Sequence, residues 1–332
     1  MTCTSFVTGP TGSVGLALVE ELISRGHEVI ALVRSRERAL SLPEGAKYII
    51  GDINDFSVEE LGKGAIDYVF HLAAVTDITP HSRGDSSAIW QVNVEGTRNI
   101  TRIAGQIKAK RFVHFSTIDV YGKKIAGYAD ESHDLSPDTL YAETKIAAER
   151  MVHEEFFEKE NETRATILRL AAVYGPNMKG NYPRLVKALK ERRFIPIGKG
   201  DNRRALIYER DVARAAILVA NNPLAAGKIY NVSDGGLYTV NEIIAVMCNA
   251  LKRRPPALYI PDALAMWSAW VADRLSSRLG IQVHLAEAVE KYTADIPVKA
   301  DKIREELGFY PEYDLRAGWQ ETLGVWESKG FL

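Results

Sequence analysis

Short apolar runs alternate with helix-like patterns along the first half of the chain. The runs that indicate buried strands are residues 5–8, 28–33, 48–50, 68–71 and 112–116. Apolar residues recur at helical spacing over residues 14–24, 88–107 and 141–159. Strands that alternate with helices form βαβ units, in which the strands are parallel. The pattern therefore predicts an α/β fold with a doubly wound parallel sheet of the Rossmann type.

The second half leaves this pattern and then returns to it. A strand predicted at 165–170 ends near Tyr174, after which turn residues become more frequent. A helix at 211–220 and a strand at 228–232 follow, and from Thr239 the chain is mainly helical. We expect two interleaved domains, and their bounds follow from these changes. They are a dinucleotide-binding domain of residues 1–177 plus about 208–236, and a smaller, mostly helical substrate domain of about 178–207 plus 237–332.

A glycine-rich segment joins the first predicted strand to the first predicted helix. Residues 8–15 read TGPTGSVG, with glycines at positions 9, 12 and 15. Gly9 would permit a tight turn, Gly12 would let the backbone approach a pyrophosphate, and Gly15 would let the helix pack closely on the strand. The N-terminus of that helix supplies N–H groups to phosphates. The residues expected to bind a nicotinamide dinucleotide here are Gly9, Thr11, Gly12, Ser13, Val14 and Gly15.

The end of the second predicted strand bears on the choice between NAD and NADP. About 20 residues beyond the loop, an NAD enzyme carries an acidic residue that binds the adenosine ribose. This chain has VRSR at residues 33–36 instead. Arg34 would form a charge-assisted hydrogen bond with a 2′-phosphate. We therefore favour NADP, with NAD as the alternative if the arginines belong to a solvated loop.

A tyrosine and a lysine four residues apart open the helix predicted at 141–159. Their spacing places the Tyr141 phenol and the Lys145 ammonium on one helix face. A positive charge held nearby favours the phenolate, which suits an acid/base near neutral pH. Such pairs are common on surface helices, but this one follows a nucleotide-binding half-domain. A catalytic role is therefore favoured.

These motifs and several others, in order along the chain, resemble those of the extended short-chain dehydrogenase/reductase family. The matching segments are 8–15 (TGPTGSVG), 51–52 (GD), 71–74 (HLAA), 93–97 (NVEGT), 116–117 (ST), 120–122 (VYG), 141–145 (YAETK), 174–176 (YGP) and 301–311 (DKIREELGFYP). The resemblance implies hydride transfer between nicotinamide and a substrate carbinol or carbonyl carbon. Tyr141 would move the matching proton, and Lys145 would also hold the ribose hydroxyls of the cofactor.

The same resemblance assigns further site residues. Thr117 would hydrogen-bond the reacting substrate oxygen, with Ser116 as the second candidate. Members of the family commonly pair through helices of the main domain, which implies a homodimer through residues 88–107 and 141–159. Asp52 and Ile53 would lie at the adenine. The residues implied beside the inner phosphates and ribose of the cofactor are Leu72, Ala73 and Ala74.

The positions after Thr117 distinguish the reactions of this family. Sugar-nucleotide dehydratases typically carry an Asp-Glu pair there, whereas this chain has Ile118 and Asp119. An isoleucine cannot donate a proton, so dehydration is disfavoured. We expect reduction or epimerisation at a carbinol or keto carbon, with reduction of a 4-keto group as the first choice.

Two segments of the second half indicate a nucleotide-sugar substrate. Residues 180–182 (GNY) and 200–208 (GDNRRALIY) resemble segments that surround the diphosphate in nucleotide-sugar enzymes. Arg204 is the candidate for binding this diphosphate, and Asn181 is the second candidate. An arginine in a turn is often structural, so Arg204 has a competing interpretation without a ligand.

Two other functions stay open. Hydroxysteroid dehydrogenases and dihydroflavonol reductases share the VR type of strand end found at residues 33–34. A helix containing Trp267 and Trp270 would then line a flat apolar pocket, although such aromatics are more often core or dimer contacts. The second alternative is a regulator that senses the nucleotide without catalysis. Such a regulator would usually lack the tyrosine or the lysine, and both are present.

Composition and charge limit the partners and the location. Basic residues number 42 and acidic residues 43, so no overall field attracts nucleic acid or an anionic membrane. Cys3 and Cys248 match no metal or redox spacing, and no export signal is evident, so we expect no metal and a cytoplasmic location. The longest apolar stretch, residues 263–272, is about half of the ~20 residues that span a bilayer. We therefore expect no membrane span.

Overall fold

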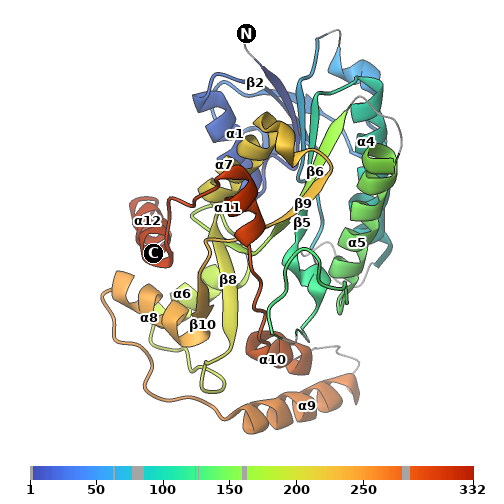
Figure 1. Ribbon diagram of the computed structural model, residues 1–332. Coiled ribbons are helices and arrows are strands. Elements are labelled where there is room, and N and C mark those ends of the chain that lie inside the picture. Colours follow the sequence, from blue (N-terminus) through green and yellow to red (C-terminus); the bar gives the residue numbers. More distant parts are fainter. Residues whose placement is uncertain are drawn as a thin grey trace.

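The computed structural model describes residues 3–62, 64–76, 86–123, 125, 127–158, 163–278 and 285–332 (Figure 1). A seven-stranded sheet runs through its larger part in the order β3-β2-β1-β4-β5-β6-β9, and every pairing in it is parallel. Its strands are β1 (Thr4–Thr8), β2 (Glu28–Val33), β3 (Lys47–Ile50), β4 (Tyr68–His71), β5 (Arg111–Thr117), β6 (Arg164–Leu170) and β9 (Lys228–Val232). The predicted strands and the doubly wound parallel sheet are confirmed.

Helices cover both faces of this sheet, and alternate strand residues decide which helices they meet. The covering helices are α1 (Ser13–Ser24) and α7 (Glu209–Asn221) on one face, and α4 (Gly96–Gln106) and α5 (Leu140–His153) on the other (Figure 1). Phe112 and Ile167 are buried in the core that includes α4 and α5. Their neighbours Val113 and Leu168 are buried in the core that includes α1 and α7. This alternation follows from the two-residue period of a strand.

The helix predicted at 88–107 is interrupted. The chain forms α3 (Ser86–Trp90), a π-helical segment η2 (Gln91–Glu95) and then α4. The Asn93 side chain in η2 is buried; it accepts from the Val75 backbone N–H at 2.7 Å and donates to the Thr144 hydroxyl at 2.9 Å. Through these hydrogen bonds of Asn93, the π-helical segment η2 connects the segment after β4 to α5. The helix predicted at 141–159 likewise ends in a π-helical segment, η4 (Glu154–Glu158), and residue 159 lies outside the described part of the chain.

A second sheet of three strands supports the smaller part of the molecule. It contains β7 (Ala172–Tyr174), β8 (Arg203–Tyr208) and β10 (Leu237–Thr239) in the order β10-β8-β7. The helices around it are α6 (Asn181–Lys190), α8 (Val240–Ala250) and α12 (Leu315–Ser328). Tyr174, Tyr208 and Trp319 form its fully buried aromatic centre. The sequence did not predict this sheet, and the division into two domains at the stated bounds stays a prediction.

In the described residues between α8 and α12, which leave out 279–284, the chain forms three more helices. They are α9 (Asp262–Arg278), α10 (Leu285–Thr293) and α11 (Asp301–Leu307), in agreement with the mainly helical tail that was expected. The apolar stretch at 263–272 lies within α9. None of the helices in the described residues is long and apolar enough to cross a membrane.

Candidate active site

The glycine loop joins β1 to α1 and lies against the end of β4. Gly9 has a φ of +69°, and a Cβ there would lie 2.7 Å from the backbone nitrogen of Ala73. A Cβ on Gly15 would collide with the Gly9 carbonyl. Gly12 differs, because the nearest protein atom would be 3.4 Å from its Cβ. Packing among the described residues does not require glycine at position 12, whereas close approach of a pyrophosphate would.

The N-terminus of α1 has features that suit it to binding an anion. Its N-cap residue is Gly12, which makes no side-chain capping hydrogen bond, and the first turn contains no acidic residue. The first N–H groups of a helix lack intrahelical acceptors and lie at the positive end of its dipole. The Ser13 hydroxyl donates to Glu209, so Ser13 would offer only its backbone N–H to a phosphate. Burial raises the pKa of Glu209 to about 7, which reduces its negative charge near this end of α1.

The strand order brings the other expected cofactor residues to the same edge of the sheet. Arg34 follows β2 and is exposed, and in the described residues no hydrogen bond or ion pair holds its guanidinium. Asp52 follows β3, where its carboxylate accepts from the backbone and side-chain N–H groups of Asn54 at 2.9 and 2.8 Å. Ile53 is buried beside Gly96. The remaining expected cofactor residues at this edge are partly exposed. They are Thr11 and Val14 after β1, and Leu72, Ala73 and Ala74 after β4.

Tyr141 and Lys145 lie in the first turns of α5. Thr139 caps this helix by accepting a hydrogen bond from the Ala142 N–H, and Tyr141 is partly exposed. Lys145 is only 2% exposed, and its Nζ lies 3.4 Å from Nε2 of His114. Burial lowers the pKa of Lys145 to about 8, and the Glu149 carboxylate on the next turn of α5 opposes this decrease. Lys145 is therefore mostly an ammonium at neutral pH.

Two buried histidines lie behind Lys145. His114 on β5 and His71 on β4 stack with ring centroids 5.5 Å apart. Burial lowers the pKa of His114 well below its usual value and that of His71 to about 3, and the Lys145 charge lowers both further. His71 is bonded through its two ring nitrogens to Thr8 and Thr97. Both rings are therefore neutral, so the positive charge stays on Lys145.

A buried ion pair supports the base of the site. Arg169 on β6 donates to both carboxylate oxygens of Glu149, with the shortest distance at 2.7 Å, and the two side chains are 4% and 6% exposed. Arg169 also donates to the Tyr121 hydroxyl at 3.0 Å. Sequence reasoning missed this pair. An arginine inside the apolar run 165–170 and a glutamate four residues after Lys145 were the signals available.

The hydroxyls of Ser116 and Thr117 have different partners. Ser116 donates to Oε1 of Glu149 at 2.5 Å, so its proton is already used within the protein. Thr117 ends β5, and its Oγ1 accepts from the Asp119 N–H at 3.2 Å. Among the described residues no acceptor engages the Thr117 O–H, so it can donate to a substrate oxygen. Ile118 is 4% exposed and belongs to the apolar core.

The two expected substrate residues lie around the smaller sheet. Asn181 is the exposed first residue of α6. Arg204 on β8 donates to the backbone carbonyls of Tyr292 and Ala294, so part of its guanidinium holds the C-terminal end of α10. Burial lowers the pKa of Arg204, and Tyr182 and other acidic neighbours raise it. Asp119 is one of those neighbours, which places Arg204 near the end of β5.

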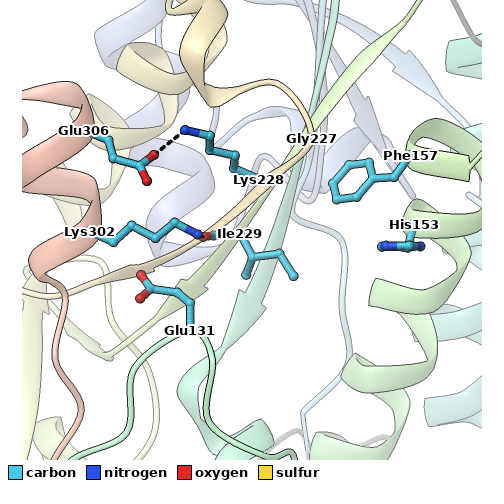
Figure 2. A pocket seen from close by; sticks show the side chains of 8 residues that line it. All are labelled: Glu131, His153, Phe157, Gly227, Lys228, Ile229, Lys302 and Glu306. Atoms are coloured by element: carbon cyan, nitrogen blue, oxygen red, sulfur yellow. Dashed lines mark hydrogen bonds and ion pairs between the residues drawn. The ribbon is translucent and has the colours of Figure 1, made fainter.

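A separate cavity of about 330 Å³ lies along the outer strand β9 (Figure 2). Its charged groups are already partnered: Lys228 pairs with Glu306 at 2.6 Å, and Lys302 donates to the Ile229 carbonyl at 3.0 Å. Glu131 accepts from the Asn231 N–H at 2.7 Å. The cavity contains none of the expected site residues and does not belong to the candidate active site.

Comparison with known proteins agrees with this geometry. Residues 5–233 match the NAD dependent epimerase/dehydratase family. The chain belongs to this family. Its relatives are epimerases, reductases and dehydrogenases, so this family member is an NAD(P)-dependent oxidoreductase or epimerase, and the regulator alternative is disfavoured.

Two relatives and one solved structure illustrate which proteins this chain is similar to. A UDP-glucose 4-epimerase of Vibrio cholerae is 26% identical over 321 residues, which cover 95% of this chain and 93% of that protein. A 3 beta-hydroxysteroid dehydrogenase/Delta 5-->4-isomerase of Mycobacterium tuberculosis is 30% identical over 347 residues, with 97% and 90% covered. The solved structure of MoeE5 with UDP-glucuronic acid and NAD has a TM-score of 0.78 and 25% identity, and covers 98% of this chain and 99% of that chain.

Proposed function

We propose that this family member transfers a hydride at one carbinol or keto carbon of a nucleotide sugar, by 4-keto reduction or 4-epimerisation rather than dehydration. The observation that carries the proposal is the residue that follows Thr117. Ile118 is buried in the apolar core and cannot donate the proton that the elimination of water needs, and Asp119 alone cannot fill both positions of the dehydratase pair. The similarity to a UDP-glucose 4-epimerase and to MoeE5 with UDP-glucuronic acid supports the substrate class.

The chain's own residues have distinct roles in this reaction. When bound, a nicotinamide cofactor would accept or donate the hydride. Lys145, an ammonium on the same helix face as Tyr141, favours the phenolate. Tyr141 takes the proton from the substrate hydroxyl on oxidation and returns it on reduction. Thr117 donates to the same oxygen and fixes its position.

The diphosphate would bind at the smaller sheet. Arg204 supplies charge there, and Asn181 at the start of α6 supplies a second donor. Arg204 also holds the carbonyls of Tyr292 and Ala294 at the C-terminal end of α10, so its role includes fixing this helix end beside the smaller sheet. A homodimer through residues 88–107 and 141–159 and a cytoplasmic location complete the proposal.

A second candidate is a hydroxysteroid-type dehydrogenase. The 30% identity to the Mycobacterium tuberculosis enzyme over 97% of this chain favours it. The same Tyr141, Lys145 and Thr117 would act on an apolar alcohol or ketone. The two candidates differ in whether a diphosphate is bound.

Products distinguish these candidates. Incubating the protein and cofactor with UDP- and dTDP-hexoses and their 4-keto forms should give either an epimer of unchanged mass or an alcohol with two more hydrogens. Mass spectrometry and NMR of the sugar measure both. Loss of water from the sugar would overturn the proposal, and turnover of steroids without nucleotide-sugar binding would favour the second candidate. The Tyr141→Phe protein is the matched control.

Cofactor choice gives a further prediction. We propose a preference for NADP(H) over NAD(H) that depends on Arg34, because this side chain is exposed after β2 and is not bonded within the described residues. A charge-assisted bond is worth roughly 1.5 to 3 kcal/mol, so Arg34→Ala should remove about one to two decades of discrimination. Dissociation constants for the two nucleotides test this, with Arg38→Ala as control. Equal or tighter binding of NAD(H) by the unaltered protein would contradict it.

A further inference from the structure

Helix α9 has an exposed apolar face that the proposed reaction does not use. Leu264, Trp267, Trp270 and Leu275 are 54%, 63%, 53% and 54% exposed. At 3.6 residues per turn, these four positions fall within an arc of about 140°. Ala265 and Ala269, on the opposite side, are buried against Val289 of α10. The helix lies along the outer margin of the molecule beside α10 (Figure 1). Because its opposite side is buried against α10 and the four side chains are more than half exposed, the apolar face is directed to solvent.

The charged side chains of α9 also differ between the exposed apolar face and the opposite side of the helix. Arg274 is exposed on the apolar arc, and its guanidinium lies 5.0 Å from the centre of the Trp270 ring. The Asp273 carboxylate is on the other side, where it accepts from the backbone N–H groups of Leu285 and Ala286. Residues 252–278 contain five basic and two acidic side chains, although the whole chain has a net charge of −1. Three of the basic ones, Lys252, Arg253 and Arg254, are exposed in the segment that leads to α9.

We propose that this face of α9, made by Leu264, Trp267, Trp270 and Leu275 with Arg274, docks on the surface of an anionic lipid bilayer. Tryptophan and leucine insert at the boundary of head groups and acyl chains, and nearby arginine and lysine pair with anionic head groups. A helix of 17 residues that is fixed to the fold through its other face lies in the interface and does not cross it. The net charge of −1 is a sum over the whole chain and therefore does not exclude this local excess of basic side chains.

Vesicle binding by the full-length protein tests the docking surface. Sedimentation with vesicles of phosphatidylglycerol mixed with phosphatidylcholine should carry down the unaltered protein, and vesicles of phosphatidylcholine alone should carry down less. The double substitution Trp267→Ser with Trp270→Ser should weaken binding by on the order of tenfold or more, because two large apolar side chains are lost from the contact. Leu224→Ser, which changes a side chain of 61% exposure after α7, should leave binding unchanged.

A charge variant and the oligomeric state complete the test. Arg274→Glu should weaken binding to the anionic vesicles and leave the weak binding to phosphatidylcholine unchanged. Absence of vesicle binding by the unaltered protein would overturn the proposal. Vesicle binding by the double variant equal to that of the unaltered protein would also overturn it. The melting temperature of the double variant shows whether it is folded. If light scattering shows that the double variant dissociates an oligomer and neither protein binds vesicles, the face contacts a second copy and the proposal is wrong.

Discussion

Replacing Tyr141 by phenylalanine should lower kcat by about 10² to 10⁴, which corresponds to roughly 3 to 5 kcal/mol of transition-state stabilisation. The substitution removes only the hydroxyl that moves the substrate proton. The ring, the cap at Thr139 and the buried Lys145 remain. Affinity for the nucleotide should stay within a few fold, because the phosphate-binding loop is unchanged. Steady-state rates and a nucleotide titration measure the two quantities.

The control for this variant is Tyr310→Phe, since Tyr310 is 66% exposed on the surface. It should leave both rate and affinity unchanged. Near-normal turnover by Tyr141→Phe would refute the assignment of the proton-transfer group. A large loss of nucleotide affinity in the same variant would show that the phenol acts mainly in cofactor binding.

Removing one partner of the buried Glu149–Arg169 pair should destabilise the fold by about 3 to 5 kcal/mol. Arg169→Leu leaves the Glu149 carboxylate 6% exposed and without its cation. Glu149→Leu has the converse effect and also leaves the Ser116 hydroxyl without its acceptor. The double variant should lose less than the sum of the two, because it removes both charges of the pair, although the buried Lys145 ammonium then lacks the nearby Glu149 carboxylate. Urea unfolding of the four proteins measures these differences.

The exposed pair of Arg304 and Asp301 is the matched control. Both side chains are 47% exposed and lie 2.7 Å apart. Arg304→Ala should cost less than about 1 kcal/mol, because solvent screens an exposed pair. If Arg169→Leu costs no more than Arg304→Ala, the buried pair does not hold β6 and α5 together beneath the site.

The larger sheet was predictable because its strands are short segments rich in apolar residues that alternate with helical patterns and turn residues. The strands 28–33, 68–71 and 228–232 were predicted with the bounds that the structure shows. The smaller sheet was missed because β7 and β10 have only three residues each, too few to show an alternating pattern. The π-helical turn at η2 was missed for a related reason: apolar spacing cannot report an added residue within one turn.

The sequence motifs predicted the edge of the sheet where the candidate site lies, but not the buried electrostatics around it. The glycines of the loop at Gly9 and the pair of Tyr141 and Lys145 have the spacing that their expected chemistry requires. This spacing is visible in the sequence. The contacts of Glu149 with Arg169 and Ser116 join α5, β6 and β5 through tertiary packing. Local periodicity contains no information on such contacts, so only the fold could reveal why Ser116 is engaged and Thr117 is available.

The origin of the hydrogen at the reacting carbon tests the central claim most directly. A UDP-hexose that carries deuterium at C4 should be incubated with the protein and oxidised nicotinamide cofactor, and the label followed by mass spectrometry. Hydride transfer at C4 predicts that the deuterium passes to the cofactor, and that an epimerising enzyme returns it to C4 of the inverted sugar. Deuterium lost to water, or a product lighter by one water molecule, would contradict hydride transfer at a single carbinol carbon.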